Sequence, residues 1–361
     1  MDRSPVTAAR PDTGQGLPAA PPGAEPGWAA PGIFPVAPGV HRIPLPLPND
    51  ALRAVNVYAI EDGDGLVLID SGWALAEARS RLEDALAELG HGLGDVSRFL
   101  ITHVHRDHYT QAVALRREFG ARISLGIGER PSLELSADGH ELKLAPQLRR
   151  LRGCGAAEVA DRLTVTLGTR PAEASVWELP DEWVAGPAAI ALRDRSLQPL
   201  PTPGHTRGHL CFLDASAGLL FAGDHVLPHI TPSIGFEPAL AALPLGDYLQ
   251  SLRLVRERPD TRLLPAHGPV TDSTHARVDA LLAHHAARLD ATERAVAQGA
   301  STAQETARLL TWTRRERPLG DLDLFNQMLA VLETAAHLDL LVMRGGLRAI
   351  LSDGVTGYCA R

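Results

Sequence analysis

The chain has 361 residues, 45 % of them hydrophobic, and a formal net charge of −8 at pH 7. This length allows one large domain and a smaller one, and the apolar content is sufficient for a packed core. No stretch reaches the roughly 18 uninterrupted apolar residues of a membrane span, so we expect no membrane association. The acidic balance argues against a general nucleic-acid binder, because such binding depends on neutralising phosphates.

The three cysteines, Cys154, Cys211 and Cys359, are far apart and form no Cys-x-x-Cys pair. This spacing argues against a disulfide framework and against a thiolate zinc site. Cys211 lies in a predicted strand, where we expect an inert buried thiol. The N-terminus has no positively charged start leading into an apolar segment, so we predict no secretory signal and expect a cytoplasmic location.

Residues 1–36 are rich in Pro, Ala and Gly and carry no periodic apolar pattern. We therefore predict a disordered tail, or a stretch upstream of the native start. Order is expected to begin near Gly39. Strands are predicted over 54–60 and 66–70, on either side of an acidic, glycine-rich turn.

Strands and helices then alternate along the chain, which indicates an α/β fold with helices packed outside sheets. The apolar periodicity predicts helices over 75–89, 109–119 and 247–256, and strands over 99–101, 121–125, 198–200, 210–213, 219–222 and 262–264. Residues 127–195 are less regular and include a helical pattern over 142–152. We interpret them as an insertion near a cleft, in which Trp177 and Trp183 serve packing rather than substrate stacking.

The C-terminal residues 271–361 are predicted to form a separate, mainly helical unit. Its expected elements are a long helix over 275–296, a short helix capped by Ser301 and Gln304, a helix over 322–340, and strands over 341–343 and 347–351 around the turn Arg344-Gly345-Gly346. Helices followed by a hairpin resemble a winged helix. Because this unit has no basic run, nucleic acid is not the expected partner, and a structural or homodimer-forming role is favoured over a wall for the substrate cleft.

Four potential metal ligands lie within six residues in the run His103-Val104-His105-Arg106-Asp107-His108. Helix or strand amphipathicity does not explain this pattern. The run follows a predicted buried strand, so its side chains are expected to converge from a turn. Imidazole nitrogens and carboxylate oxygens are ligands that zinc prefers, at roughly 2.0–2.2 Å.

Three further ligand types follow predicted strands downstream. His205 stands in a Pro-Gly-His sequence, Asp224 in Gly-Asp-His, and His267 in Ala-His-Gly. Ligand sites in α/β sheets gather beyond the carboxyl ends of the strands, so all of these side chains are expected at one metal site. Two metals about 3.5–4 Å apart can share a water and lower its pKa toward neutrality.

These motifs resemble the metallo-β-lactamase superfamily, in the order that the family shows, over about residues 40–270. The resemblance implies a four-layer αββα sandwich over 37–270 with two zinc ions, although such ligands also accept iron or manganese. It places the first metal on His103, His105 and His205, the second on Asp107, His108 and His267, and Asp224 between the two. Asp70 and Thr102 resemble residues that support the metal loop without binding metal.

Asp224 is a carboxylate at a position where some true β-lactamases use cysteine, so the site resembles the glyoxalase II and lactonase type. The implied activity is hydrolysis of a small ester, thioester or lactone by attack of a metal-bridging hydroxide, with Asp107 and Asp224 as catalytic carboxylates. Tyr109, His225 and His229 are candidates for contact with this small-molecule substrate. Among the other histidines, His209 is expected to pack behind the site, and His284 and His285 to be structural.

Three other functions compete with this reading. A phosphodiesterase or nuclease would use the same metal pair, but the chain shows no basic stripe. A mononuclear iron persulfide dioxygenase would need fewer ligands than the two complete sets present. A regulator would use the winged-helix-like tail, with the metals only stabilising the fold. A similar tail occurs in a branch of the superfamily that includes nucleases and carrier-protein thioesterases.

Overall fold

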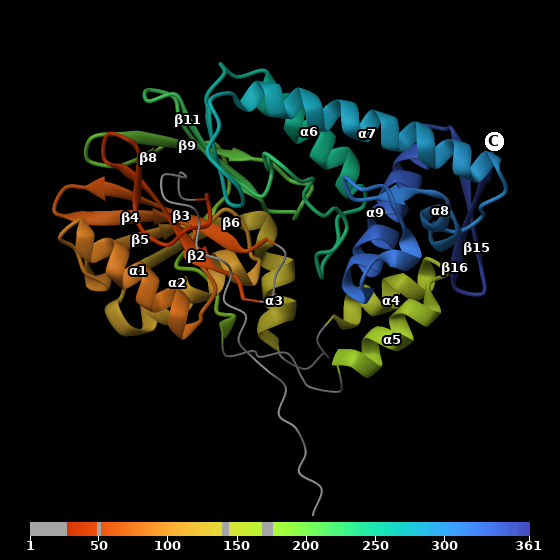
Figure 1. Cartoon of the computed structure of the whole chain (residues 1–361), viewed down its shortest axis with the longest axis horizontal. Helices are drawn as coiled ribbons and strands as arrows, with labels where there is room; N and C mark the ends of the chain where they lie inside the picture. The colour runs from red at the N-terminus through yellow and green to blue at the C-terminus, as the bar shows by residue number, and fades with distance from the viewer. Residues whose placement is uncertain (1–26, 49–51, 139–143, 168–175) are drawn as a thin grey trace, which may run out of the picture.

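The computed structural model describes residues 27–48, 52–138, 144–167 and 176–361, and two β-sheets lie face to face on the left-hand side of Figure 1. The first sheet has the order β1-β2-β3-β4-β5-β6-β7 and the second β12-β11-β10-β9-β8. The first contains β1 (Phe34–Ala37), β2 (Val40–Pro46), β3 (Ala54–Asp62), β4 (Gly65–Ile69), β5 (Val96–Leu100), β6 (Arg122–Gly126) and β7 (Glu182–Val184). The second contains β8 (Ile190–Ala191), β9 (Ser196–Pro201), β10 (Leu210–Asp214), β11 (Leu219–Gly223) and β12 (Arg262–Pro265).

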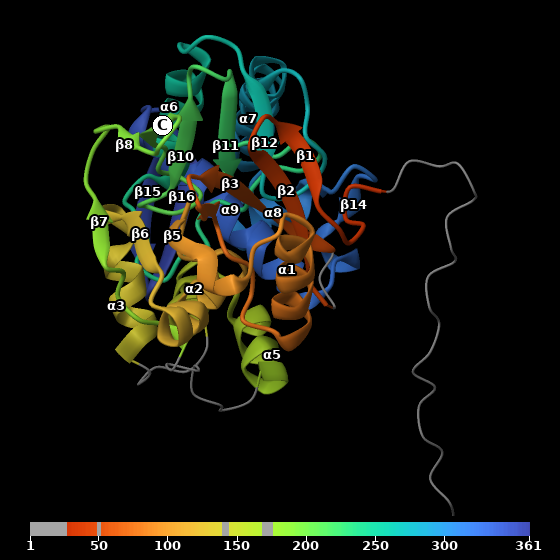
Figure 2. The ribbon, with the colours of Figure 1, turned by 90° about the vertical axis from the view of Figure 1, so that its left-hand side faces the viewer.

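Helices cover the outer face of each sheet. The helices α1 (Ala76–Glu88), α2 (Arg106–Phe119) and α3 (Arg130–Asp138) lie on the side of the first sheet, and α6 (Pro244–Arg256) and α7 (Thr274–Ala297) on the side of the second. Figure 2 shows α1 and α2 on the opposite side of the sheets from α6 and α7. The predicted αββα order is thereby confirmed.

Burial along the strands explains this layering. Phe212 and Phe221 belong to the cluster between the two sheets, whereas Cys211, Leu213 and Leu220 belong to the cluster under the outer helices. Successive side chains of a strand point to opposite faces, so strands that are apolar at every position are buried on both faces. Cys211 is fully buried, as its place in the sequence predicts.

The N-terminal boundary differs from the predicted one. Residues Phe34–Ala37 form strand β1, which pairs antiparallel with β2 in the register Phe34 to Arg42, so the predicted disorder is wrong for them. Pro35 fits there because β1 is an edge strand of the sheet, where a missing N–H group is tolerated. Residues 1–26, which make up most of the predicted tail, lie outside the described residues.

Helix α2 begins at Arg106, three residues before the predicted start. Asp107 and His108 therefore lie in the first turn of a helix instead of a loop. A carboxylate in this position is favoured by the partial positive charge of the helix N-terminus. The apolar periodicity did not reveal this turn because its residues are polar.

The C-terminal residues comprise α8 (Ala303–Leu309), β13 (Thr311–Trp312), β14 (Arg317–Pro318), α9 (Leu324–Met343), β15 (Leu347–Ser352) and β16 (Val355–Ala360). The predicted strand over 341–343 is wrong, because α9 continues through these apolar residues to Met343. The hairpin is formed by β15 and β16 instead. The capping box of α8 uses Thr302 and Glu305, one residue later than predicted.

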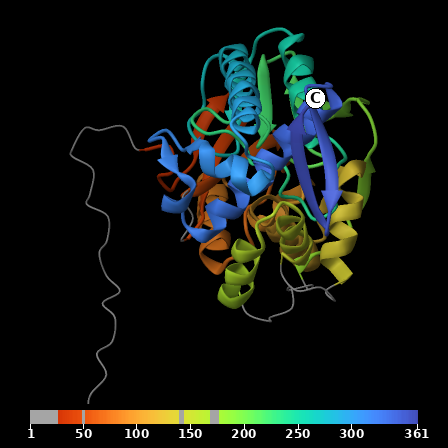
Figure 3. The ribbon, with the colours of Figure 1, turned by 90° about the vertical axis from the view of Figure 1, so that its right-hand side faces the viewer.

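The C-terminal helices share their core with the rest of the molecule. Helices α4 (Ala145–Gly153) and α5 (Ala157–Leu167) of the insertion pack against α9, and one apolar cluster joins them to α6, α7 and the outer face of the second sheet. Figure 3 shows α4 and α5 beside the C-terminal helices and hairpin. Residues 271–361 thus share an apolar core with the insertion and the second sheet, and their division into a separate, winged-helix-like unit stays a prediction. Residues 139–143 and 168–175 of the insertion lie outside the described part.

No helix in the described part of the chain is both long enough and apolar enough to cross a membrane.

Candidate metal centre

The predicted ligands all follow the ends of neighbouring strands at one rim of the sandwich. His103 and His105 follow β5, His205 follows β9, Asp224 follows β11, and His267 follows β12, while Asp107 and His108 begin α2. Parallel pairing of β4 with β5 and of β11 with β12 brings their carboxyl ends to the same edge of each sheet. The structure thus brings together seven side chains that span more than 160 residues of the sequence.

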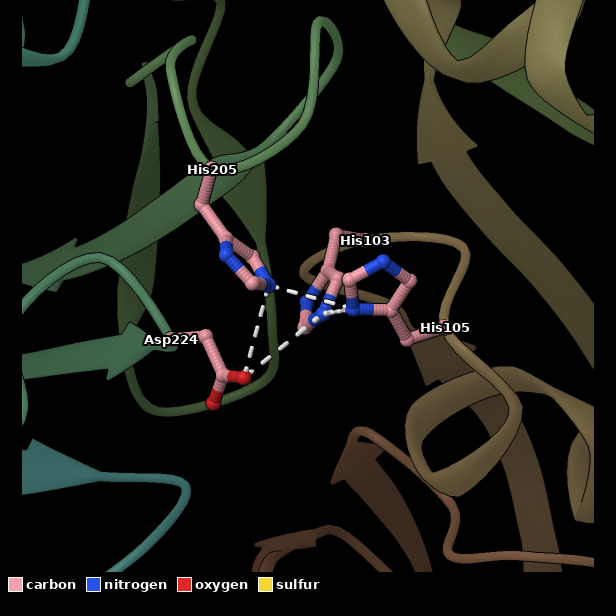
Figure 4. Close-up of side chains that lie close together, drawn as sticks. All are labelled: His103, His105, His205 and Asp224. Atoms are coloured by element: carbon pink, nitrogen blue, oxygen red, sulfur yellow. Dashed lines mark hydrogen bonds and ion pairs between the residues drawn. The ribbon is translucent and has the colours of Figure 1, made fainter. Parts of the chain in front are cut away.

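The first group of ligand atoms is centred on His105. Its Nδ1 lies 3.0 Å from Nε2 of His103 and 3.1 Å from Nε2 of His205. Figure 4 shows these three imidazoles and Asp224 directed toward one another, and their ligand atoms all lie within 4.8 Å of each other. Two nitrogens on one tetrahedral zinc stand about 3.3 Å apart, given zinc–nitrogen bonds of roughly 2.0–2.1 Å.

Hydrogen bonds on the far side of two rings fix which nitrogen carries a proton. His205 Nδ1 donates to the carbonyl oxygen of Ser233 at 2.7 Å. His103 Nδ1 lies 3.0 Å from the hydroxyl of Thr102, which in turn donates to Asp70. Both Nε2 atoms therefore carry a lone pair toward the group, as metal-ligating histidines do.

The second group consists of Asp107, His108 and His267. The Nδ1 of His108 donates to Asp70 Oδ2 and that of His267 to the carbonyl oxygen of Ala54, each at 2.8 Å. Their Nε2 atoms lie 3.6 Å and 3.5 Å, respectively, from Asp107 Oδ2. Both rings direct Nε2 toward the carboxylate of Asp107.

Asp224 stands between the two groups and presents one oxygen to each. Its Oδ2 lies 3.5 Å from His205 Nε2 and 3.9 Å from His103 Nε2. Its Oδ1 lies 3.3 Å from His267 Nε2 and 3.7 Å from His108 Nε2. A carboxylate with this orientation has the geometry of a bridge between two cations.

Three buried ligand atoms without hydrogen-bond partners in the described part of the chain indicate that the centre suits divalent cations. Nε2 of His108, Nε2 of His267 and Oδ1 of Asp224 are buried and have no hydrogen-bond partner among the described residues. An unsatisfied buried polar atom costs about 1–3 kcal/mol, so three of them converging on one space indicate a missing positive partner. Borderline-soft zinc matches this set of imidazoles and carboxylates.

Electrostatics divide the two groups. Burial lowers the pKa of His105 to about 3, and the neighbouring imidazole of His205 adds to the effect, so the His105 ring is neutral at pH 7. Burial also opposes protonation of His108, but the carboxylates of Asp70, Asp107 and Asp224 raise its pKa to about 10. The excess negative charge of the second group attracts protons, which a bound cation would displace.

Asp70 and Thr102, which the resemblance places behind the metal loop, hydrogen-bond to each other and to one histidine each. Asp70 accepts from His108 Nδ1, from the Thr102 main-chain N–H at 2.8 Å and from the Thr102 hydroxyl at 3.0 Å. It thereby orients one histidine of each group. Asp70 also adopts a left-handed backbone with φ of 61°, a conformation that Asp and Asn tolerate better than most residues.

The variant Asp70→Asn is expected to weaken zinc affinity and turnover by about 10–100-fold, the usual effect of removing a carboxylate behind a metal-ligating histidine. Asparagine keeps the left-handed backbone, so the folded structure should survive. Asp353→Asn is a matched control, because Asp353 has φ of 51° in an exposed position. Equal zinc affinity in both variants, measured by competition with a chromophoric chelator, would contradict the role of Asp70.

The remaining predicted residues lie around the centre in different ways. His209 is buried behind it, where Nε2 accepts from the Asp224 main-chain N–H at 3.2 Å and the ring stacks on His103. His225 is fully buried against Tyr248, with ring centroids 5.1 Å apart. His229 is exposed beside Gly268, which follows the ligand His267.

Tyr109, a predicted candidate for substrate contact, lies in the core. Its ring is fully buried in the core under the first sheet, and its hydroxyl donates to the carbonyl oxygen of Glu178 at 2.5 Å. The ring stacks on Trp177, whose predicted packing role this contact supports. Since the hydroxyl is engaged away from the ligands, we do not propose Tyr109 as a substrate contact.

Sequence reasoning missed two residues that hold the ligand loops. The amide of Asn56 donates to the carbonyl oxygens of Pro265 and Gly268, each at 2.9 Å, and so fixes the loop of His267. A polar side chain within the buried, apolar part of strand β3 was a signal for such a role. Glu129 is fully buried and accepts from the hydroxyl of Thr206, next to His205.

Glu129 makes stability depend on pH. Burial raises the pKa of its carboxyl from 4.5 to about 8, against the hydrogen bond from Thr206. Between these values the folded protein keeps a proton that the unfolded chain has lost, so stability falls as pH rises. The free energy of unfolding of Glu129→Gln should therefore rise relative to that of the wild type, by on the order of 1 kcal/mol for each pH unit between these two values. Urea unfolding at several pH values measures this difference.

A control for this prediction is Glu118→Gln, because Glu118 is exposed and paired with Arg79. The difference in the free energy of unfolding between Glu118→Gln and the wild type should stay constant across the same pH range. A constant difference for Glu129→Gln would show that Glu129 is ionised throughout.

The loop of His205 crosses the segment before α3 at a very close approach. A Cβ atom on Gly208 would stand 2.1 Å from the main-chain nitrogen of Glu129. Because the neighbour is backbone, it cannot rotate away. We expect Gly208→Ala to lower the free energy of unfolding by about 3 kcal/mol, at the upper end of common overpacking costs.

Gly186→Ala is the matched control, since an added Cβ there would meet no atom within 4 Å. Its effect should stay within about 0.5 kcal/mol. Urea unfolding midpoints that are the same for both variants would disprove the close approach.

Comparison with known proteins agrees with this geometry. The family model of the metallo-beta-lactamase superfamily matches residues 50–267. The probable metallo-hydrolase YqjP of Bacillus subtilis is 27 % identical over 314 residues, covering 83 % of this chain and 90 % of that protein. An atrochrysone carboxyl ACP thioesterase of Aspergillus fumigatus is 24 % identical over 67 % of this chain and 44 % of its own length.

Among solved structures, a beta-lactamase domain protein from Burkholderia ambifaria superposes with a TM-score of 0.76 at 26 % sequence identity. The match covers 91 % of this chain and 94 % of that one, and so extends beyond the residues that the family model matches. The family match, the fold and the order of the ligand motifs agree. The chain belongs to the metallo-beta-lactamase superfamily.

Proposed function

We propose that the chain is a binuclear metal hydrolase that cleaves a small ester, thioester or lactone. The observation that carries the proposal is the orientation of Asp224, whose two oxygens face two separate groups of imidazoles. His103, His105 and His205 would hold one zinc ion, and Asp107, His108 and His267 the other. Iron or manganese would also suit these ligands.

Two bound cations would supply Lewis acidity and acidify a water toward neutral pH. The chain's own contribution is preorganisation. Asp70, Ser233 and Ala54 accept hydrogen bonds from Nδ1 of three ligand rings. The Nε2 atoms of these rings therefore already face the metal positions and need no rearrangement. Asp107 is 14 % exposed at the side chain, more than Asp224, His205, His267 or His108, and is positioned to pass a proton to a leaving group through water.

A thioester is the first substrate class to test. The fungal relative named above is a thioesterase by its printed name, and it aligns over two thirds of this chain. No cysteine lies among the ligands, so the centre consists of oxygen and nitrogen donors throughout. Such a set suits acyl transfer to water from substrates with a good leaving group.

The test is a panel of acyl thioesters, aryl esters, lactones and bis-aryl phosphates, offered to zinc-loaded protein. Turnover of an acyl substrate with at least two zinc ions per chain is the expected result. Preferential cleavage of the phosphodiester would favour the phosphodiesterase alternative. Oxygen consumption by iron-loaded protein with a persulfide would favour the dioxygenase, and the absence of turnover with metal-dependent stability would favour a regulator.

A further inference from the structure

A second cluster of possible metal ligands lies between helices α7 and α9. His284 and His285 belong to α7 and Glu333 to α9, and one ligand atom of each lies within 4.8 Å of the others. Tyr248 separates this cluster from the metal centre, because its ring contacts His285 on one side and His225 on the other. Figure 1 shows that α7 extends from the second sheet to the C-terminal helices.

A chain of hydrogen bonds fixes the tautomer of His285. The Nδ1 of His337 lies 2.8 Å from the main-chain oxygen of Glu333 and must donate to it. The Nε2 of His337 therefore carries a lone pair and accepts from Nδ1 of His285 at 3.2 Å. The Nε2 of His285 is consequently left without a proton.

This Nε2 atom lacks a hydrogen-bond partner among the described residues, although His285 is fully buried. A protonated Glu333 carboxyl would be one partner, but the structure contains no hydrogen bond between the two groups. The nearby cation, Arg288, is directed elsewhere: it donates to the carbonyl oxygen of Thr311 and lies over the ring of Trp312. A bare, buried nitrogen beside a second imidazole and a carboxylate matches a metal ligand.

We propose that His284, His285 and Glu333 form a third metal site, which takes a borderline-soft divalent cation such as zinc. Two imidazole nitrogens and one carboxylate oxygen are a common zinc donor set. His337 behind His285 plays the supporting part that second partners play at metal sites. Because His284 is exposed, the ion has an entry path and a position open to water.

The role of this site is structural. Its ligands join two helices whose contact closes a loop of more than 40 residues, and a metal bound to the folded state alone stabilises it by mass action. The site lies apart from the two groups that Asp224 joins. Occupancy should therefore raise thermal stability without changing turnover.

The test compares zinc content and thermal stability of the full-length wild type with His284→Asn and Glu333→Gln. After dialysis against buffered zinc, the wild type should retain one more zinc ion per chain than either variant. Added zinc should raise the Tm of wild type already loaded at the catalytic centre, and this rise should be absent from both variants. Hydrolysis of the best substrate should be the same in all three proteins.

His91→Asn is the control, since His91 is a surface histidine beside an acidic residue, Asp95, on another part of the molecule. It should keep the zinc content of the wild type. Equal zinc content in the wild type and His284→Asn would overturn the proposal. Because the His284 side chain is exposed, this variant decides the matter even if Glu333→Gln fails to fold.

Discussion

Replacing Asp224 by asparagine is expected to lower kcat/KM by about a thousandfold or more. The change preserves shape but removes the charge that faces both groups of imidazoles, at 3.3 Å and 3.5 Å. Charge stabilisation by a metal pair is worth several kcal/mol, and about 1.4 kcal/mol corresponds to a factor of ten in rate. Initial rates on the best substrate, with zinc content measured on the same samples, test the prediction.

Asp272→Asn is the control for this variant, because the Asp272 side chain is 99 % exposed. It should keep wild-type rates and zinc content. If Asp224→Asn retained more than about a tenth of the wild-type kcat/KM, a bridging role for Asp224 would be untenable.

Asp107→Ala is expected to abolish turnover because it removes a ligand of the second group alone. Asp107 faces only the second group, where its Oδ2 lies near the Nε2 atoms of His108 and His267. The first group keeps all its nitrogens, so the variant should lose one zinc ion and retain the other. Because Asp107 is partly exposed in the first turn of α2, the fold should survive, as far-UV circular dichroism would show.

Glu77→Ala is matched to Asp107→Ala by position, since Glu77 is also the second residue of its helix, α1. It removes the same kind of favourable charge at a helix N-terminus without touching the ligands. Its turnover should equal that of the wild type. Full activity in Asp107→Ala would contradict the proposed mechanism.

The ligands could be predicted from the sequence because their chemistry is carried by side chains. The run His103 to His108 cannot be produced by amphipathicity, and each later ligand follows a strand whose apolar residues are easily recognised. The ends of adjacent strands meet at one rim of the fold. The side-chain types and the strand ends together therefore predict which residues meet.

The groups that orient the ligands could not be predicted in the same way. The carbonyl oxygens of Ser233 and Ala54 belong to the main chain, which has the same chemistry at every residue. Tyr109 follows the ligand His108 in the sequence. Consecutive residues of a helix point in different directions, however, and the ring of Tyr109 is buried in the core. Adjacency in the sequence therefore predicted a substrate contact that the geometry does not support.

Long-range packing also lay beyond the sequence. The helices of the insertion carry apolar residues that fit either a cleft or a partner helix, and the partner proved to be α9. Apolar periodicity shows that a face is buried but does not identify what covers it. The same ambiguity made residues 341–343 read as a strand when they are the last turn of α9.

The most direct test of the account is a crystal structure of the zinc-loaded protein, with the ions located by anomalous scattering at the zinc edge. We predict two peaks at the metal centre, about 3.5–4 Å apart, with one oxygen of Asp224 toward each. A single peak among His103, His105 and His205, with Asp107, His108 and His267 free of metal, would contradict the binuclear centre.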